Sequence, residues 1–316
     1  MVRSLVTGGS GFIGSHVVDA LRNAGHEVIV FDRERPRAQL DVEFYAGELS
    51  DLDAVCRATE GVDYVHHVAA VSNVNHAFER PIECVETNVL GSVHVLEAAR
   101  RANVRRVMFA STVWVYNAAR EPHVNEDSPL YMPGPGHIYT SSKIACELMF
   151  HDYAALYKIP ITVFRYGIPY GPRMRAELLI PIFLKRALSG EPLLIAGDGM
   201  QARNFVYVED VARAHVLGLA DACESQIVNL DGAHAVSVLE VARKVRDLVG
   251  AHVSIEHTPG RPGDYVGKHV SLDKAQQLMG WSPSTAFDEG MRRTFSWYMA
   301  TYGGGSLRHE ARPSAS

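Results

Sequence analysis

The chain lacks most of the features that mark a secreted, metal-binding or membrane protein. Only 4 of its 316 residues are cysteine, and Cys56, Cys84, Cys146 and Cys223 are too far apart for C-x-x-C pairs. This usage argues against disulfides and zinc and favours reduced thiols in the cytoplasm. No apolar run reaches the roughly 18 residues of a membrane span. Because a glycine-rich turn begins at Thr7, we expect no signal peptide.

An excess of charge of one sign is also lacking. The formal net charge is −5, and charged residues make up 21% of the chain. We therefore expect neither nucleic acid nor a membrane surface as a partner. Hydrophobic residues make up 47% of the chain, so a protein of this length can bury one large core together with a smaller lobe.

The most informative segment is residues 7–14, with the sequence TGGSGFIG, which follows an apolar run and opens an amphipathic one. Gly8, Gly11 and Gly14 have the spacing of the turn that leads from strand to helix in dinucleotide-binding folds. In that turn, glycine allows the backbone to approach a pyrophosphate and the helix to pack closely on the strand. The N terminus of the helix then directs its free N–H groups toward the phosphates. We predict a dinucleotide site here.

Asp32 lies eighteen residues beyond Gly14, at the end of the strand-like run 27–32. A carboxylate at this spacing accepts hydrogen bonds from the adenosine ribose and repels a 2′-phosphate, which favours NAD over NADP. Arg33 weakens this preference slightly. The alternative, a solvated residue at the end of a strand, accounts for less of the pattern.

Five strand-like runs, at residues 2–7, 27–32, 62–68, 106–110 and 161–166, alternate with segments of helical periodicity. This order predicts an α/β fold, a Rossmann-type doubly wound parallel sheet with helices on both faces. Shorter elements with Pro and Gly turns follow. We predict an NAD-binding domain over residues 1–166. Residues 167–302 should mainly form a smaller C-terminal α/β substrate lobe, with some of them returning to the Rossmann core. We predict a flexible tail over residues 303–316.

Tyr139 and Lys143 are four residues apart in a segment with helical character, so their side chains share one helix face. The pKa of tyrosine, about 10, is too high for a base at neutral pH, but a neighbouring ammonium and an oxidised nicotinamide both favour phenolate. Such pairs are common on surfaces. Together with the glycine turn, however, this pair predicts a general base.

Beyond these local patterns, the chain resembles the extended short-chain dehydrogenases/reductases, in particular the NAD-dependent epimerase/dehydratase family that acts on nucleotide sugars. The resemblance extends to about residue 302. It rests on motifs at residues 7–14, 67–70, 88–91, 111–116, 139–143, 170–172, 197–199, 203–208, 259–264 and 278–283.

The resemblance implies a catalytic triad of Thr112, Tyr139 and Lys143, with Lys143 also holding the nicotinamide ribose and Asn88 supporting the site. Positions that match cofactor-lining residues of the family are Gly8, Gly11, Phe12, Ile13, Gly14, Asp32, Arg33, Glu48, Leu49, Val68, Ala69, Ala70, Asn88, Tyr139 and Lys143. Positions that match substrate-binding residues are Thr112, Leu179, Arg203 and Arg261, the two arginines being suited to a diphosphate.

Val113 and Trp114 help to choose the reaction. By the resemblance, 4,6-dehydratases carry an Asp-Glu pair at these positions, and uronic acid decarboxylases carry Glu at the second. Without a carboxylate there, epimerisation is favoured, at C4 of an NDP-hexose or NDP-uronic acid through a transient ketone. NAD would be regenerated in each cycle. A decarboxylase or dehydratase ranks lower.

Two departures from the family pattern leave more than one class of substrate compatible with the sequence. Ile168 stands where Asn is usual, and Asn204 stands where Asp is frequent. An NAD(P)-dependent dehydrogenase or reductase of a non-nucleotide carbinol is therefore an alternative, and a non-catalytic dinucleotide sensor is a third. His66 and His67 are adjacent on a strand and should point to opposite faces, so we expect no metal site. By the resemblance, we expect a homodimer formed through helices near residues 88–102 and 139–158.

Overall fold

The computed structural model describes residues 1–36, 41–131, 136–250, 252–259 and 267–303. Its centre is a sheet of seven parallel strands in the order β11-β7-β5-β4-β1-β2-β3. Their bounds are β1 Arg3–Thr7, β2 Glu27–Asp32, β3 Glu43–Ala46, β4 Tyr64–His67, β5 Arg106–Thr112, β7 Ile161–Tyr166 and β11 Gln226–Leu230. The predicted doubly wound parallel sheet is confirmed. Its strand order reverses between β1 and β4, where such folds bind ligands at the carboxyl ends of the strands.

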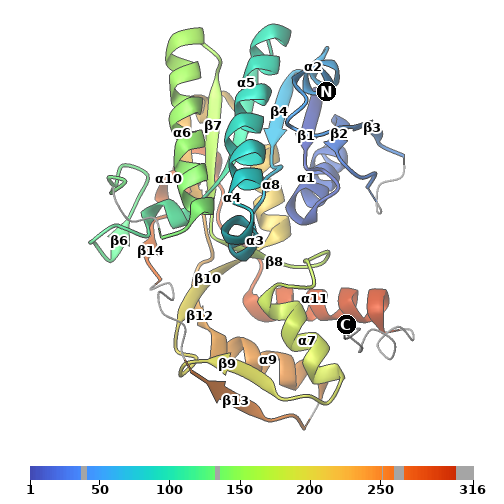
Figure 1. The fold of residues 1–316 in the computed structure, drawn as a ribbon, viewed down its shortest axis with the longest axis vertical. Helices are drawn as coiled ribbons and strands as arrows, with labels where there is room; N and C mark the ends of the chain where they lie inside the picture. Colours follow the sequence, from blue (N-terminus) through green and yellow to red (C-terminus); the bar gives the residue numbers. More distant parts are fainter. Residues whose placement is uncertain (37–40, 132–135, 251, 260–266, 304–316) are drawn as a thin grey trace.

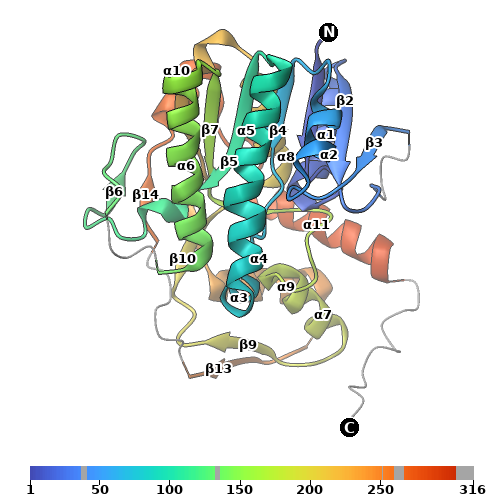
Figure 2. The same ribbon diagram turned by 45° about the horizontal axis from the view of Figure 1, so that its top comes forward.

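Helices cover both faces of this sheet (Figures 1 and 2). One apolar cluster joins α2, α5 and α6 to the strands, and two others join α1, α8 and α10 to the opposite face. The bounds are α1 Phe12–Asn23, α2 Leu52–Thr59, α5 Gly91–Ala102, α6 Ile138–Tyr157, α8 Val208–Leu217 and α10 Asp273–Met279. None of the helices within the described ranges is both long and apolar enough to cross a lipid bilayer.

α1 illustrates why the sequence adopts this arrangement. Val17, Val18 and Leu21 are fully buried and form its sheet-facing stripe. Gly25, just beyond the helix, has φ +81°, a left-handed conformation that glycine adopts without steric cost. The opposite directions of His66 and His67 are also confirmed, since His66 hydrogen-bonds His215 of α8 and His67 hydrogen-bonds Ser92 of α5.

A smaller lobe continues from the carboxyl end of β7 and occupies the lower half of Figure 1. Its described residues form one three-stranded sheet, a parallel strand pair and three helices around an apolar cluster of their own. The bounds are β8 Ile168–Tyr170, β10 Ala202–Tyr207, β12 Ala235–Ser237, β9 Leu193–Ala196, β13 Ile255–Thr258, α7 Leu179–Leu188, α9 Val238–Val249 and α11 Phe287–Tyr302. The lobe therefore faces the edge of the large sheet at which its strands end.

The remaining elements are short. The pair β6 and β14 projects from the side of the large sheet (Figure 2). A run of α3, α4 and the π-helix η1 precedes α5, and the 3-10 turn η2 follows β5 directly. A further 3-10 turn, η3, precedes β11. The bounds are β6 His123–Val124, β14 His269–Val270, α3 Val74–Glu79, α4 Pro81–Val85, η1 Glu86–Leu90, η2 Val113–Tyr116 and η3 Asp221–Cys223.

Candidate active site

The glycine turn between β1 and α1 is closely packed. Gly8 has φ +71°, and its N–H donates to the Phe31 carbonyl at 2.9 Å. A side chain at Gly8 would put its Cβ 2.8 Å from the backbone of Ala69, and one at Gly14 would put its Cβ 2.0 Å from the Gly8 carbonyl oxygen. The turn therefore requires glycine at both positions, and it brings three backbone segments to one point.

The first turn of α1 presents backbone donors at this point. Gly11 is its N-cap and provides no side-chain acceptor, and the first turn contains no acidic residue. Phe12 and Ile13, which follow, are both partly buried. Uncapped N–H groups and the helix dipole favour a bound anion, so the turn fits a pyrophosphate.

Asp32 lies beside this turn at the end of β2. One carboxylate oxygen accepts the Ser10 N–H at 3.0 Å, and the other accepts the Arg33 N–H at 2.7 Å. Each oxygen retains a second lone pair for a ribose hydroxyl. The carboxylate is thus fixed next to the glycine turn, while Arg33 is exposed. This donor and acceptor set fits NAD.

The segment after β4 forms another wall. The N–H groups of Val68 and Ala69 lie 3.3 Å from the carbonyl and hydroxyl oxygens of Thr7, respectively, and Ala70 follows at partial exposure. Asn88, buried in the π-helix η1, clamps the next residue, Val71. Its Oδ1 accepts the Val71 N–H at 2.7 Å, and its Nδ2 donates to the Val71 carbonyl at 3.0 Å.

Asn88 also joins this wall to α6. The same Nδ2 lies 2.9 Å from the hydroxyl oxygen of Ser142, beside Lys143 in the sequence. π-Helical turns often occur at functional sites. Asn88 therefore connects the β4 loop to the helix that carries Tyr139 and Lys143.

Leu49 and Glu48, in the loop after β3, differ in their exposure to solvent. Leu49 is buried against α5, where a Cβ added to Gly91 would lie 2.6 Å from the Leu49 Cβ. Glu48 is exposed and forms a weak 3.4 Å contact with Ser50. Leu49 thus fixes the loop after β3, while Glu48 is at the surface.

Thr112, Tyr139 and Lys143 come from two adjacent elements. Thr112 ends β5, two residues beyond the predicted end of that strand, and the other two lie in the first two turns of α6. Burial raises the pKa of Tyr139 above its ordinary value, whereas the positive charge of Arg175 and a hydrogen bond with Thr112 lower it. The structure therefore brings the Thr112 hydroxyl to the Tyr139 phenol.

Lys143 is buried, and its Nζ donates to the Ala110 carbonyl at 2.7 Å and lies 4.6 Å from the centroid of the Phe109 ring. Burial lowers its pKa to about 8, so the amine remains mostly cationic at neutral pH. Its two other N–H donors can serve a ligand. Lys143 thus places a buried cation one helical turn from Tyr139.

A buried ion pair holds α6 against the sheet. Arg165 of β7 and Glu147 of α6 form a two-pronged contact, with distances of 2.6 Å from Nη2 to Oε2 and 3.0 Å from Nε to Oε1. The Ser111 hydroxyl donates to Glu147 at 2.5 Å. Because Ser111 precedes Thr112 and Glu147 is one turn after Lys143, this pair fixes α6 relative to the end of β5. Sequence reasoning missed it, because Arg165 and Glu147 are 18 positions apart and meet only where α6 packs on the sheet.

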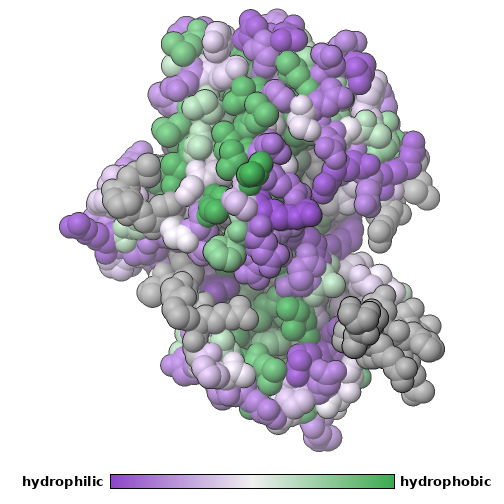
Figure 3. Space-filling model, viewed as in Figure 1, coloured by the Kyte–Doolittle hydropathy of each residue, from purple (hydrophilic) through white to green (hydrophobic). Residues whose placement is uncertain are grey.

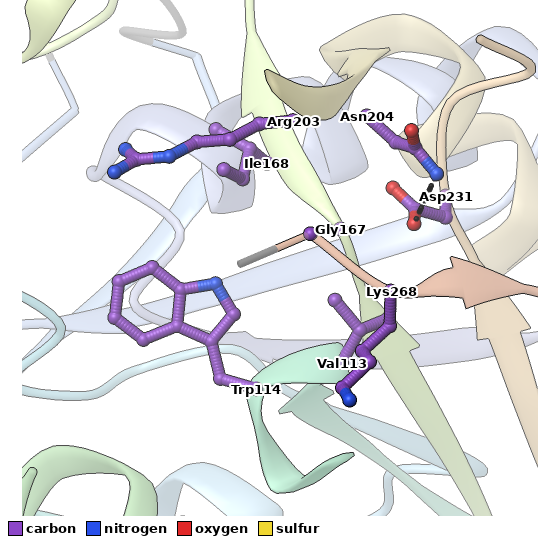
Figure 4. Close-up of a pocket in the computed structure, with 9 residues that line it drawn as sticks. Val113, Trp114, Gly167, Ile168, Arg203, Asn204, Asp231 and Lys268 are labelled. Carbon is purple, nitrogen blue, oxygen red and sulfur yellow. Dashed lines mark hydrogen bonds between the residues drawn. The ribbon is translucent and has the colours of Figure 1, made fainter. Parts of the chain in front are cut away.

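A pocket opens where three strands of the large sheet end. Thr112 pairs with Tyr166, and Tyr166 pairs with Leu230, so the residues that follow them line up at the sheet edge. The pocket is lined by Val113, Trp114, Gly167, Ile168, Arg203, Asn204, Asp231, Gly267 and Lys268 (Figure 4). The indole of Trp114 lies edge-on to the Tyr139 ring with centroids 6.5 Å apart, so the pocket adjoins the phenol.

The expected substrate-binding residues fall in three places. Arg203 lines this pocket, while Leu179 begins α7 and packs against the core of the small lobe. Arg261 lies outside the described residues. Asp231, another pocket residue, was missed by sequence reasoning. The only sequence signal for it was an Asp-Gly turn at the end of an apolar run.

Taken together, a dinucleotide turn, an acidic strand end and a Tyr–Lys pair beside a Thr hydroxyl define a nicotinamide-dependent enzyme of the short-chain dehydrogenase/reductase type. The NAD dependent epimerase/dehydratase family model matches residues 4–230. The chain belongs to this family, and NAD is its cofactor.

Similar proteins within the family catalyse different reactions. A putative UDP-glucose 4-epimerase of Methanocaldococcus jannaschii is 32% identical, over 93% of this chain and 97% of the relative. A UDP-N-acetyl-alpha-D-glucosaminuronate decarboxylase of Bacillus cytotoxicus is 29% identical, over 94% and 97%. The crystal structure of a Thermus thermophilus UDP-glucose 4-epimerase with NAD has a TM-score of 0.83 and 34% identity, over 94% of this chain and 98% of that one. Epimerases and decarboxylases are thus comparably similar.

Proposed function

We propose that this protein is an NAD-dependent nucleotide-sugar 4-epimerase, and that residues 167–302 mainly form its substrate-binding lobe. The observation that carries the proposal is the side-chain set at the end of β5. The Thr112 hydroxyl lies close enough to the Tyr139 phenol to lower its pKa, and the next two positions hold Val113 and Trp114. This set can exchange a proton with a sugar hydroxyl, but it offers no carboxylate at the two positions directly after Thr112.

The proposed role of the Thr112 hydroxyl is to orient the C4 oxygen of the sugar toward Tyr139. The phenolate of Tyr139 removes the proton of that hydroxyl, and Lys143 stabilises the phenolate by its charge. NAD, when bound, supplies the hydride acceptor and donor and a positive charge near the phenol. Gly8, Asp32 and Lys143 would hold it.

The second half of the reaction needs the opposite face of the C4 ketone. The sugar must turn relative to the phenol, and Tyr139 then returns the proton to the C4 oxygen. Trp114 and Ile168 give the pocket largely apolar walls. Arg203 provides a guanidinium suited to the diphosphate, which stays in place while the sugar turns.

The proposal is tested by incubating the purified protein with UDP-glucose, dTDP-glucose and UDP-glucuronate and identifying the products by NMR. We expect inversion at C4 in at least one of them and no net reduction of nicotinamide. Release of carbon dioxide would indicate a decarboxylase, and a 4-keto-6-deoxy sugar a dehydratase. Stoichiometric reduced nicotinamide would indicate a dehydrogenase. Each of these three results would overturn the proposal.

We further propose a homodimer formed through α3 to α6. Apolar side chains gather over this face (Figure 3), and the exposed ones are Phe78, Ile82, Val85, Leu90, Leu148, Leu156 and Tyr157. Monomeric proteins seldom expose so extended an apolar surface. The face belongs to helices packed on the Rossmann sheet, so two copies can associate with both substrate lobes left accessible.

Leu148→Glu should convert the dimer to a monomer. Leu148 is 57% exposed, and a carboxylate buried between two copies should weaken association by roughly a hundredfold or more. Size-exclusion chromatography with light scattering measures the change. Leu194→Glu, at a 42% exposed position of β9, is the matched control and should remain dimeric. A monomeric wild type, or a dimeric Leu148→Glu, would contradict this interface.

A cytoplasmic location is also proposed. All four cysteines are free thiols in the structure, three of them buried. Free thiols persist most readily in a reducing compartment.

A further inference from the structure

Asp231 is a buried carboxylate at the edge of the substrate pocket. The residue is 2% exposed. Its Oδ2 accepts a hydrogen bond from Asn204 Nδ2 at 3.1 Å (Figure 4). Its Oδ1 accepts the Gly232 N–H at 2.8 Å. Within the described parts of the chain, its hydrogen-bond partners include no cation. A buried carboxylate held only by neutral donors is costly, which points to a use in binding.

The carboxylate of Asp231 packs directly against Gly167. Leu230 pairs with Tyr166 across β11 and β7, so the residues that follow, Asp231 and Gly167, lie side by side. A Cβ at Gly167 would lie 1.8 Å from Asp231 Oδ1 and 2.6 Å from its carboxyl carbon. The space that a side chain at position 167 would occupy is therefore filled by the carboxylate.

Asp231 is the one carboxylate among the described residues that line this pocket. Val113, Trp114 and Ile168 provide apolar walls. The charged ends of Arg203 and Lys268 point away from the Asp231–Asn204 pair in Figure 4, and Lys268 Nζ donates to the Ala119 carbonyl at 2.7 Å. The pair thus forms a distinct acceptor site on one side of the pocket.

We infer that Asp231, oriented by Asn204, determines specificity by selecting a neutral sugar and rejecting a sugar that carries a carboxylate. This inference rests on the proposed function and narrows its substrate class. An ionised Asp231 accepts a hydrogen bond from a sugar hydroxyl. In the same place a uronate carboxylate meets a like charge in a poorly solvated pocket, where repulsion is strong.

The selectivity should depend on pH. Burial raises the pKa of Asp231 to about 7, while the hydrogen bonds from Gly232 and Asn204 oppose that rise. The charged groups that line the described pocket with it are Arg203 and Lys268, and the neighbouring positions 113, 114, 167 and 168 carry none. Below this pKa the protonated acid can donate to a uronate, and above it the anion repels one. Discrimination against a uronate should therefore increase as pH rises through 7.

The test compares UDP-glucose and UDP-glucuronate as alternative ligands of the intact protein with NAD. Dissociation constants are measured by calorimetry, and kcat/KM by the NMR assay. The wild type should favour UDP-glucose by about tenfold or more at about pH 8, and by less at about pH 6. Asp231→Asn keeps the shape and one acceptor oxygen, so its preference should fall toward one and lose its dependence on pH.

Two further variants keep the result interpretable. Asp231→Ser serves if Asp231→Asn does not fold, and it should show the same loss of preference. Asp221→Asn removes an equal charge at a fully exposed side chain and should leave both the preference and its pH dependence unchanged.

An Asp231→Asn protein that keeps the wild-type preference and pH profile would overturn the inference, as would a wild type that favours UDP-glucuronate. Measurements of binding and of turnover test the role of Asp231 and the epimerase activity separately. Preferential binding of UDP-glucose without inversion at C4 would contradict the proposed function but support this role for Asp231.

Discussion

Tyr139→Phe should reduce kcat for nucleotide-sugar epimerisation by about a thousandfold, within the range that general acid–base catalysis contributes. In the proposed mechanism the phenol is the proton acceptor in the first half-reaction and the donor in the second, so its loss should affect both. Phe retains the ring that lies edge-on to Trp114. NAD binding and KM should therefore change little, and the loss should appear in kcat.

Tyr302→Phe is the matched control for this change. Tyr302 is the last residue of α11 and is 37% exposed, so removal of its hydroxyl should leave kcat within about twofold of the wild type. Turnover by Tyr139→Phe close to that of this control would exclude Tyr139 as the base. A loss of NAD from Tyr139→Phe would instead indicate a structural role.

Gly14→Ala should remove NAD from the purified protein. The new methyl group would lie 2.0 Å from the Gly8 carbonyl oxygen, so α1 must move away from the turn that holds the pyrophosphate. Overpacking of this kind costs about 1–3 kcal/mol of stability. Bound NAD per chain, measured by absorbance after denaturation, reports the first effect, and urea unfolding reports the second.

Gly25→Ala separates the clash from the general cost of replacing a glycine. Gly25, unlike Gly14, has a positive φ, and a Cβ there would meet no atom within 4 Å. This variant should lose about 1–2 kcal/mol of stability from backbone strain and keep its NAD. Wild-type NAD content in Gly14→Ala would show that the turn tolerates a side chain and does not hold the cofactor as described.

The sequence was sufficient for features that depend on neighbours along the chain. The spacing of Gly8, Gly11 and Gly14, the apolar run that ends at Asp32, and the one-turn separation of Tyr139 and Lys143 all reflect local geometry. These features, with the alternation of strands and helices, allowed the parallel sheet and the cofactor to be predicted correctly. The family could be identified because such motifs occur together in a fixed order.

Features that depend on strand pairing could not be predicted in this way. Asp231 and Gly167 are 64 positions apart in the chain and meet only because β11 pairs with β7 in one particular register. The two short strands β6 and β14 also pair over a long separation, between His123 and His269. Neither contact has a local periodicity. The end of β5 was placed too early for a related reason, because the polar Ser111 is buried by a hydrogen bond to Glu147 from another element.

The most direct test of the account follows the hydrogen at C4. UDP-glucose carrying deuterium at C4 is incubated with the protein in ordinary water, with dTDP-glucose tested in parallel if UDP-glucose is not a substrate. The product is then examined by NMR. The account predicts a C4-inverted sugar that keeps the deuterium at C4, because the hydride removed from that carbon returns to the opposite face of the same ketone. Loss of the deuterium to solvent, or deuterium retained at an uninverted C4 beside a product changed at C5 or C6, would contradict epimerisation through a transient 4-ketone.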